Sequence, residues 1–289
     1  MSCNSIMDWT ICIPSYHRSE SIKKNTLAVL ESYKIPHDRI KIFVSEPEVE
    51  QYKSSLPEYE IVASVVGCIA NRDFIRHYWP EGKRIVYMDD DIFDISSVCD
   101  FSDDHTLCKV FKKENLGKDY YQKQMRLPDL SKFLDHAFSV MDKEDANLGG
   151  IYPIKNGFFA SHKYTRDLRY VCGGMYLERN IHDIKLQGME YSEDFERSCL
   201  FFKRDGKIIR FESVMLHTPY YKGEGGLVET RTIEKSKQAQ ELLATLYPTY
   251  LEVIPPTKNN KYWNLKVKRV MRGGRKMGRT PSATSLVEC

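Results

Sequence analysis

The chain has 289 residues, of which 42% are hydrophobic and 29% are charged, and its formal net charge is +3. These proportions are typical of a globular protein and exclude a disordered or low-complexity chain. No apolar stretch reaches the roughly 18 residues that a membrane-spanning helix needs, and the eight cysteines show no metal-binding spacing. We therefore expect a cytoplasmic protein with reduced thiols and no membrane partner.

Four strands, with helices between them, are predicted between residues 9 and 94. The strands cover residues 9–14, 40–45, 61–66 and 84–88, and helices are predicted after residue 18 and from about residue 69. Pro14 cannot donate a hydrogen bond to a neighbouring strand, so the first strand ends there. Strands that alternate with helices in this way predict a parallel sheet with right-handed connections.

The second half of the chain mixes helices with shorter strands. Helices are predicted over residues 128–142, from Glu193 to Gly206, and over 232–246, and strands over 149–152, 158–160, 170–177 and 207–217. Residues 258 to 279 contain nine Lys or Arg and no Asp or Glu. The chain after residue 256 is therefore predicted to be a basic, partly disordered extension of the domain.

Three consecutive carboxylates, Asp89, Asp90 and Asp91, directly follow the apolar strand 84–88. In α/β sheets, ligands bind outside the carboxyl ends of the strands, so these side chains are expected at a binding site. Adjacent carboxylates repel one another unless a cation lies among them, and their hard oxygen atoms suit Mg²⁺ or Mn²⁺. Because side chains alternate along a strand, Asp89 and Asp91 are expected to point the same way and Asp90 to the opposite side or to a ribose. The alternative is a solvated acidic turn.

A second acidic pair, Glu193 and Asp194, stands at the predicted start of a helix. The N-terminus of a helix stabilises one carboxylate in its ionised form, and the neighbouring carboxylate can then accept a proton. The pair is therefore a candidate for general-base chemistry. The alternative is that both residues only cap the helix, as Asp and Glu do in many proteins.

The order of these features resembles the glycosyltransferases of the GT-A fold over residues 9 to about 245. The motifs that carry the resemblance are Pro14-Ser15-Tyr16-His17-Arg18, Gly67 followed by Asn71-Arg72, the aspartate cluster, Gly173-Gly174, Glu193-Asp194 and His217. The resemblance implies an α/β, Rossmann-like fold with a mostly parallel central sheet and helices on both faces. It places a single GT-A domain at residues 8–255, with a nucleotide-sugar half at about 8–100, an acceptor half at about 101–255 and a basic C-terminal tail at 256–289.

The resemblance also implies a role for each motif. A UDP-sugar is the expected donor, and Mn²⁺ or Mg²⁺ is expected to bridge its diphosphate to the protein. The expected metal ligands are Asp91, Asp89 and His217, and Asp194 is the expected base of an inverting transfer, with Glu193 in support. Contacts to the nucleotide-sugar are expected from Pro14, Ser15, Tyr16, Arg18, Asn71, Arg72, Asp89, Asp90, Gly173 and Gly174. For His217 the alternative is a hydrogen-bonded core histidine, and for Arg72 it is an ordinary surface position on a helix.

A narrower similarity comes from the late part of the chain. His217-Thr218-Pro219-Tyr220-Tyr221, Gly225-Gly226-Leu227 and Leu246-Tyr247-Pro248 are similar to segments of the TET-associated glycosyltransferases of phages and large DNA viruses. That similarity implies a hydroxymethylated pyrimidine of DNA as the acceptor, in the cytoplasm or nucleus of a host cell. The basic tail is then expected to bind DNA, with Tyr262 and Trp263 stacking on bases. Two alternatives stay open: a glycosyltransferase with a glycan or protein acceptor, and a non-catalytic nucleic-acid-binding module with a degenerate nucleotide fold.

Overall fold

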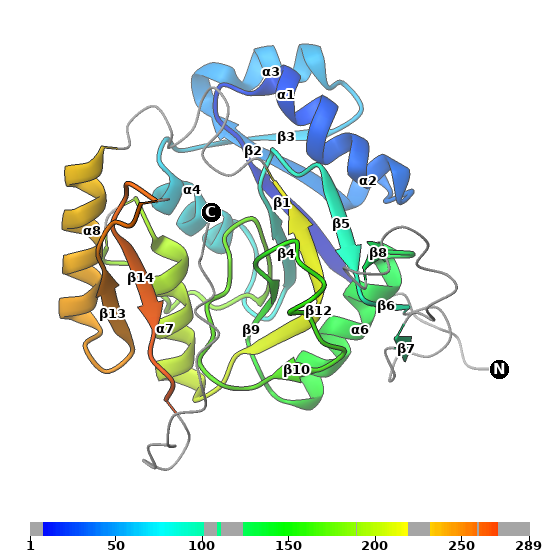
Figure 1. Ribbon diagram of the computed structural model, residues 1–289. Helices are drawn as coiled ribbons and strands as arrows, with labels where there is room; N and C mark the ends of the chain where they lie inside the picture. Colours follow the sequence, from blue (N-terminus) through cyan, green and yellow to red (C-terminus); the bar gives the residue numbers. More distant parts are fainter. Residues whose placement is uncertain are drawn as a thin grey trace.

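A ten-stranded sheet runs through the centre of the molecule in the computed structural model (Figure 1). The structure describes residues 8–100, 109–110, 124–188, 190–218, 232–258 and 260–270. The strand order is β3-β2-β1-β4-β11-β9-β12-β5-β8, and β10 pairs with β12. The strands of this sheet are β1 (Trp9–Pro14), β2 (Ile40–Ser45), β3 (Glu60–Ser64), β4 (Arg84–Met88), β5 (Asp94–Ser97), β8 (Met125–Arg126), β9 (Leu148–Tyr152), β10 (Tyr164–Thr165), β11 (Met175–Arg179) and β12 (Ile209–His217).

Most strands of the sheet point the same way. β3, β2, β1 and β4 are mutually parallel, β11 runs antiparallel to β4, and β9 and β12 return to the direction of β4. β5 and β10 run antiparallel to β12. The order β3-β2-β1-β4 followed by one antiparallel strand is a GT-A-like arrangement, and the predicted α/β fold with a mostly parallel central sheet is confirmed.

One face of the sheet is covered by helices from both halves of the chain. A continuous helical run consists of α1 (Ser19–Ile22), a π-helical turn (Lys23–Leu27) and α2 (Ala28–Ser32), and α3 (Val49–Ser55) and α6 (Leu130–Lys143) lie on the same face. Ile22, Leu30 and Phe133 from these helices share one buried cluster with strand residues. The apolar periodicity of 128–142 therefore predicts α6 to within two residues at its start.

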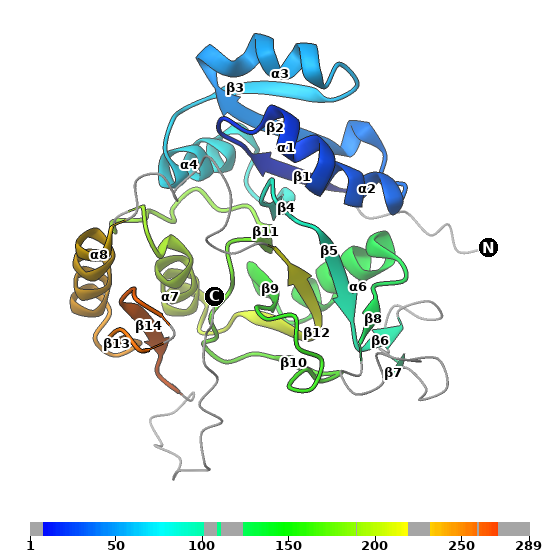
Figure 2. The same ribbon diagram turned by 45° about the horizontal axis from the view of Figure 1, so that its top comes forward.

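The other face is covered by α4 (Cys68–Tyr78) and α7 (Glu193–Asp205). Ile75 and Phe201 from these helices pack in a second cluster with Tyr87 and Tyr176 of the sheet. Outside α7 lie α8 (Ile233–Leu246) and a hairpin of β13 (Leu251–Ile254) and β14 (Asn264–Val267), which form a third cluster with it. Figure 2 shows α7, α8 and this hairpin grouped on one side of the molecule. Across the described ranges, no helix has the length and apolar composition to cross a membrane.

Short elements complete the described chain. They are 3-10 turns at His37–Arg39 and Glu46–Glu48, and a pair of two-residue strands, β6 (Cys99–Asp100) and β7 (Lys109–Val110). Cys12 and Cys172 are free buried thiols, as the sequence predicts. Cys99 is disulfide-bonded, which the sequence does not predict.

Three predicted strand boundaries are wrong. Residues 158–160 form part of a turn, in which Phe158 and Phe159 are exposed. The strand predicted over 170–177 begins only at Met175, and the strand predicted over 61–66 ends at Ser64. Phe158 and Phe159 are exposed, Val65, Val66, Tyr170 and Cys172 line a cavity, and Val171 is buried in the second cluster without being in a strand. Apolar runs alone do not distinguish these environments from a strand in the core.

The predicted boundary between the domain and its tail, at residue 255, is also wrong. β14 pairs antiparallel with β13 in the register Leu251 to Val267 and Ile254 to Asn264. Leu265 of β14 is 2% exposed and belongs to the third cluster. Residues up to 270 are therefore part of the domain. β14 pairs with β13, and its Leu265, which has lysines nearby in the sequence, packs against α8. The rest of the predicted tail, with its last four cations, lies outside the described residues.

A truncation of one β14 side chain tests this boundary. Leu265→Ala should lower the free energy of unfolding by about 2–5 kcal/mol, the usual loss for a buried leucine. Denaturant unfolding measures the loss, and Lys266→Ala, at the adjacent exposed position of the same strand, is the control. If both variants unfold like the wild type, β14 is not part of the cooperative domain.

Candidate active site

The carboxyl ends of β1 and β4 open into a cavity of about 570 Å³. The strand order reverses between these two strands, because the chain passes from β1 to β2 on one side and from β3 to β4 on the other. Ligands of open α/β sheets bind in the crevice that such a reversal leaves. The cavity is lined by Pro14, Ser15, Tyr16, Arg18, Ser45, Val65, Val66, Gly67, Cys68, Asn71, Arg72, Asp89, Asp90, Asp91, Tyr170, Cys172, Gly173, Gly174, Glu190, Ser192, Glu193, Asp194, Phe195, Gln240, Asn260, Tyr262, Trp263 and Asn264.

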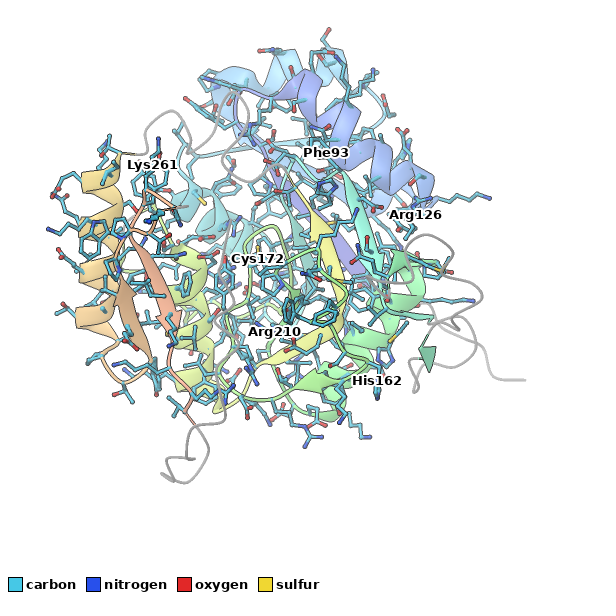
Figure 3. The ribbon with its side chains drawn as sticks, in the orientation of Figure 1. Phe93, Arg126, His162, Cys172, Arg210 and Lys261 are labelled. Carbon is cyan, nitrogen blue, oxygen red and sulfur yellow. The ribbon has the colours of Figure 1, made fainter. Side chains whose placement is uncertain are left out.

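The cavity brings together every site residue predicted from the sequence except His217. In Figure 3, Cys172 marks the segment before β11 at the centre of the view, and Lys261 marks the loop of the β13–β14 hairpin. Cys172 itself lines the cavity, as do the residues next to Lys261. Segments that are far apart in the sequence therefore meet at one concave site, which is the usual form of a ligand-binding or catalytic site.

The three aspartates occupy a turn after β4 and not the strand itself. β4 ends at Met88, so the predicted alternation of Asp89, Asp90 and Asp91 about a strand is wrong. Asp90 is buried, and its carboxylate accepts hydrogen bonds from Ser15 Oγ at 2.6 Å and Arg18 Nη1 at 2.7 Å. The side chains of Asp89 and Asp91 stay 37% and 24% exposed. Two of the three carboxylates are thus available to a ligand.

Ser15 and Arg18 both bind the aspartate turn. Ser15 is 4% exposed, and its hydroxyl bonds Asp90 and shares a hydrogen bond with Tyr52 Oη at 2.8 Å. Arg18 also reaches Asp91, with Nη1 3.4 Å from Oδ2. Two polar side chains that are expected to contact the nucleotide-sugar therefore also hold the aspartate turn. Tyr16, which stacks on His17 with ring centroids 3.9 Å apart, remains the residue of this loop that offers a flat surface to the cavity.

Arg72 joins the two acidic groups of the site. Its Nη2 donates to Asp89 Oδ1 at 2.8 Å and its Nη1 donates to Glu193 Oε1 at 2.5 Å. The side chain is buried, so the alternative of an ordinary surface position is wrong. Because the Arg72 guanidinium contacts both carboxylates, this single side chain links the aspartate turn to the start of α7.

The Glu193–Asp194 pair has two different environments. Glu193 also accepts from Arg197 Nη1 at 3.2 Å, and the two arginines outweigh the effect of burial, so the pKa of Glu193 is lowered. Asp194 accepts from Tyr170 Oη at 2.6 Å and from Phe195 N at 2.9 Å. Burial and the neighbouring charge of Glu193 raise the pKa of Asp194. One carboxylate is therefore held ionised, and the other is the more basic of the two.

The N-terminus of α4 binds a carboxylate of the protein itself. The Glu190 carboxylate accepts from Ile69 N at 3.0 Å and lies against Gly67, whose φ of 108° favours glycine. Asn71 is turned inward, where its amide donates to Phe43 O and accepts from Ser64 Oγ. Glu190 therefore supplies the anion at this helix end, and no motif in the sequence indicates it.

Gly173 and Gly174 lie in a part of the cavity wall where protein groups approach the backbone closely. A Cβ on Gly173 would lie 3.2 Å from Arg72 Nη1, and a Cβ on Gly174 would lie 3.1 Å from a Leu216 methyl group. Protein groups therefore fill part of the space beside these two glycines. The Gly174 carbonyl also accepts from Asp89 N at 2.9 Å, which ties the start of β11 to the aspartate turn.

His217 does not reach the cavity. It is exposed at the end of β12, opposite Asp94 of β5, and its ring centroid lies 5.9 Å from that of Phe93. Its backbone carbonyl accepts from Phe93 N at 2.8 Å, so its backbone lies beside the chain that leaves the aspartate turn, although its side chain does not line the cavity. A role for His217 as a metal ligand beside Asp89 and Asp91 therefore stays a prediction.

The donor atoms of the aspartate turn suit a hard divalent cation. Enclosure in the cavity raises the pKa of Asp89 to about 7, against the effect of Arg72, and Asp91 and Asp90 add to the shift. Burial and the neighbouring charge of Asp90 also raise the pKa of Asp91. In the part of the chain that the structure describes, no group of three or more His, Cys, Asp or Glu side chains is arranged to hold a metal. Asp89 and Asp91 would fit a cation that takes its other ligands from a substrate phosphate and water, as Mg²⁺ commonly does.

An aromatic wall at the α7 end of the cavity is largely missed by the sequence motifs. Tyr170 and Phe195 stack with ring centroids 4.3 Å apart, and Tyr262 and Trp263 line the same cavity. The aromatic pair at 262–263, inside a basic stretch, is the only signal of this wall that the sequence carries. Tyr170 and Phe195 carry no such signal, because their neighbourhood depends on how α7 meets β11.

No protein-family model and no curated protein matches the chain. Among solved structures it is similar to one titled a mycobacterial protein, with 10% identity and a TM-score of 0.47 over 91% of this chain and 84% of that chain. It is also similar to two structures of Staphylococcus aureus TarS. One, titled TarS 1-349, has 11% identity and a TM-score of 0.40 over 84% and 72% of the two chains, and the other has 12% identity and a TM-score of 0.44 over 83% and 39%. Similarities this distant assign no residue a role, so a function has to be argued from the cavity.

Removal of the bridging guanidinium should destabilise the protein strongly. Arg72→Met leaves the buried Glu193 and the neighbouring Asp89 with less positive charge, and a broken buried ion pair costs about 3–5 kcal/mol. Denaturant unfolding measures the loss, with Lys53→Met, which breaks an exposed pair with Glu50, as the control at about 1 kcal/mol or less. Equal losses in the two variants would contradict a structural role for Arg72.

The pH dependence of this loss has a defined sign. The folded-state pKa of Glu193 lies below its ordinary value of 4.5, so the Glu193 part of the stabilisation is complete above pH 4.5. It decreases as the pH falls through the lowered pKa, and the difference between wild type and Arg72→Met should shrink in the same range. A difference that grows on acidification would contradict an ionised Glu193.

Proposed function

We propose that the protein is a divalent-metal-dependent, inverting glycosyltransferase that moves a sugar from a nucleotide-sugar, namely a UDP-sugar, to a hydroxyl acceptor. One observation carries the proposal. The aspartate turn after β4 and the Glu193–Asp194 pair line one cavity and are joined by Arg72. A cation-binding acidic turn beside a separate, more basic carboxylate is the combination that group transfer from a diphosphate to a hydroxyl requires.

The donor half of the cavity lies at the ends of β1, β2 and β3. Tyr16, Val65 and Val66 offer apolar and aromatic surface there. Asp89 and Asp91 would hold Mn²⁺ or Mg²⁺, which as a Lewis acid would stabilise the charge that develops on a departing diphosphate. Arg18, fixed by Asp90, adds a positive charge at the same place. This half of the cavity therefore suits a nucleoside diphosphate as leaving group.

Asp194 is the proposed base. In the transfer, the acceptor oxygen forms a bond to the anomeric carbon while the bond from that carbon to the diphosphate oxygen breaks. The acceptor proton passes to the Asp194 carboxylate, and the nucleoside diphosphate leaves. Glu193 stays ionised between Arg72 and Arg197, and its charge keeps Asp194 basic. Base and leaving group then lie on opposite sides of the sugar, which is the geometry of a single inverting displacement.

For the acceptor we propose a hydroxymethylated pyrimidine of DNA. The support is the resemblance of the late segments to TET-associated glycosyltransferases, together with a basic and aromatic segment at one wall of the cavity. From 255 to 270 the chain carries Lys258, Lys261, Lys266, Lys268 and Arg269 and no acidic residue. Such a density of cations attracts a polyanion. A glycan or protein acceptor is the outcome to expect if the protein transfers a sugar but does not bind DNA at low salt.

The donor side can be tested without an acceptor. Wild-type protein incubated with a panel of UDP-sugars and Mn²⁺ should release UDP slowly, and EDTA should stop the release. Asp91→Asn should reduce the release by about 100-fold or more, because a lost charged ligand weakens the stabilisation of the leaving group by several kcal/mol. Asp94→Asn is the matched control, since Asp94 pairs with Lys155 and does not line the cavity. Absence of UDP release with every donor would favour a non-catalytic module, and an Asp91→Asn rate within tenfold of wild type would remove Asp91 from the site.

The base can be tested by a neutral substitution. Asp194→Asn should lower kcat by about 100-fold or more with little change in donor affinity, the usual effect of losing a positioned base. In the wild type, kcat should fall on the acid side as Asp194 is protonated, at a pH above its ordinary pKa of 3.8 because burial raises that pKa. Asp205→Asn, at the other end of α7, is the control. If Asp194→Asn instead abolishes donor binding, the pair organises the nucleotide site.

A further inference from the structure

We infer that the loop of the β13–β14 hairpin is the acceptor seat, and that it takes a single unpaired nucleobase stacked against Tyr262 and Trp263. This inference rests on the proposed function and deepens it. It assigns the acceptor contact to residues inside the domain and predicts that a target base in duplex DNA must leave its helix.

The first support is the position of the two rings. Tyr262 and Trp263 line the cavity together with Asn260 and Asn264, although all four lie in the stretch that the sequence assigns to a tail. Both rings are half-buried, so each keeps surface that a ligand can cover. Stacking on aromatic side chains is available to every base, because every base has a flat π-face.

The loop that carries the rings is fixed in place by hydrogen bonds. Thr257 N donates to Asn260 O at 2.8 Å, and Tyr262 N donates to Asn260 Oδ1 at 2.9 Å. The Trp263 carbonyl accepts from Ser236 Oγ of α8 at 3.1 Å. The rings are therefore preorganised by the hairpin and α8, which lowers the entropy lost when a ligand stacks on them.

The aromatic rings lie at the catalytic end of the cavity. Tyr170, which binds the proposed base Asp194 through its hydroxyl, stacks on Phe195, and Gln240 bonds Ser192 beside the start of α7 at 2.8 Å. All of these residues line the cavity with Tyr262 and Trp263. A planar ligand held here would present its hydroxyl near Asp194, whereas the donor loops lie on the other side of Arg72.

The charge around the rings favours a nucleotide over a neutral sugar. Lys237 Nζ lies 5.5 Å from the Trp263 ring centroid and Lys261 Nζ lies 5.1 Å from that of Tyr262. Both lysines stand beside the rings, and the other cations of the hairpin, from Lys258 to Arg269, lie along the same short segment. A base on the rings would therefore bring its phosphates among cations, which is the arrangement found in proteins that bind single-stranded nucleic acid.

The size of the cavity favours an unpaired base. A volume of about 570 Å³ is that of a small-molecule site. Enzymes that modify a base inside such a pocket act on single strands or rotate the target nucleotide out of the stack, and unstacking is least costly for a mismatched or single-stranded base.

Two substitutions of Trp263 test the seat through binding. Trp263 is one of three tryptophans, and Trp9 is 1% exposed. A short single-stranded oligonucleotide with one hydroxymethylcytosine should quench the fluorescence of wild type and of the control Trp79→Phe, and should not quench that of Trp263→Leu. Oligonucleotide affinity, measured by anisotropy, should fall about 5- to 100-fold in Trp263→Leu and be largely restored in Trp263→Phe, as expected for the loss and return of one stacked base. Tyr262→Leu, with folding checked by circular dichroism, gives a second variant if Trp263→Leu is unstable.

The transfer reaction provides the second arm. With a UDP-sugar and Mn²⁺, the order of kcat/KM should be single-stranded above mismatched above fully paired duplex for one oligonucleotide sequence, and Trp263→Leu should raise the acceptor KM more than it lowers kcat. Release of UDP without acceptor tests the proposed function separately. If wild type releases UDP but Trp263→Leu binds and modifies DNA like wild type, or if paired duplex is the best substrate, the acceptor seat is wrong and the proposed function stands. If DNA is neither bound nor modified while a glycan is, the nucleobase is wrong as the occupant.

Discussion

The site depends on one buried guanidinium. Arg72 extends from α4 across the end of the sheet and binds Asp89 after β4 and Glu193 at the start of α7. Without it, two groups of carboxylates would face each other across a cavity with little solvent to screen them, and their mutual repulsion would disfavour this packing of α7 against the sheet. Its position therefore decides both that the acidic groups share one cavity and that they stay on opposite sides of it.

Around Arg72, buried charges are arranged in layers between the sheet and its helices. The Arg197 guanidinium lies 3.7 Å from the centroid of the Tyr176 ring, and Tyr176 stacks on Tyr87 of β4 at 4.4 Å. Deeper in the same layer, Arg76 pairs with the fully buried Glu178 at 3.0 Å. Each arginine has a carboxylate or a ring within contact, because a buried charge is tolerated only where such partners replace water. This layer makes α4, β11 and α7 a rigid frame, so the positions of Glu193 and Asp194 follow from packing and not from a loop.

The cavity has two chemically different ends. The end formed by β1, β2 and β3 contains the aspartate turn and Arg18, whereas the end formed by α7, α8 and the β13–β14 hairpin contains Asp194 and the aromatic wall. A transfer reaction needs this separation, because the leaving group requires positive charge and the incoming hydroxyl requires a base. The hairpin closes the second end, so the last described segment of the chain completes a site that the first strand begins.

Much of the fold and part of the site could be predicted from the sequence, for local reasons. Apolar runs bounded by Pro14 and by Asp89 define the parallel strands, and the 3.6-residue period defines α6 and α8, because these patterns record which side chains the sheet must bury. The acidic groups Asp89–Asp91 and Glu193–Asp194 stand out because adjacent like charges need a compensating partner. Only the tertiary structure decided which partner each of them has. Arg72 and Arg18 bind the acidic groups, Glu190 binds the N-terminus of α4, and His217 lies on β12 beside the chain that follows the aspartate turn. The place of the hairpin at 251–267 in the site could not be predicted for the same reason. Leu265 has lysines nearby in the sequence, and it is buried because it packs against α7 and α8, whose common surface exists only after the chain has folded.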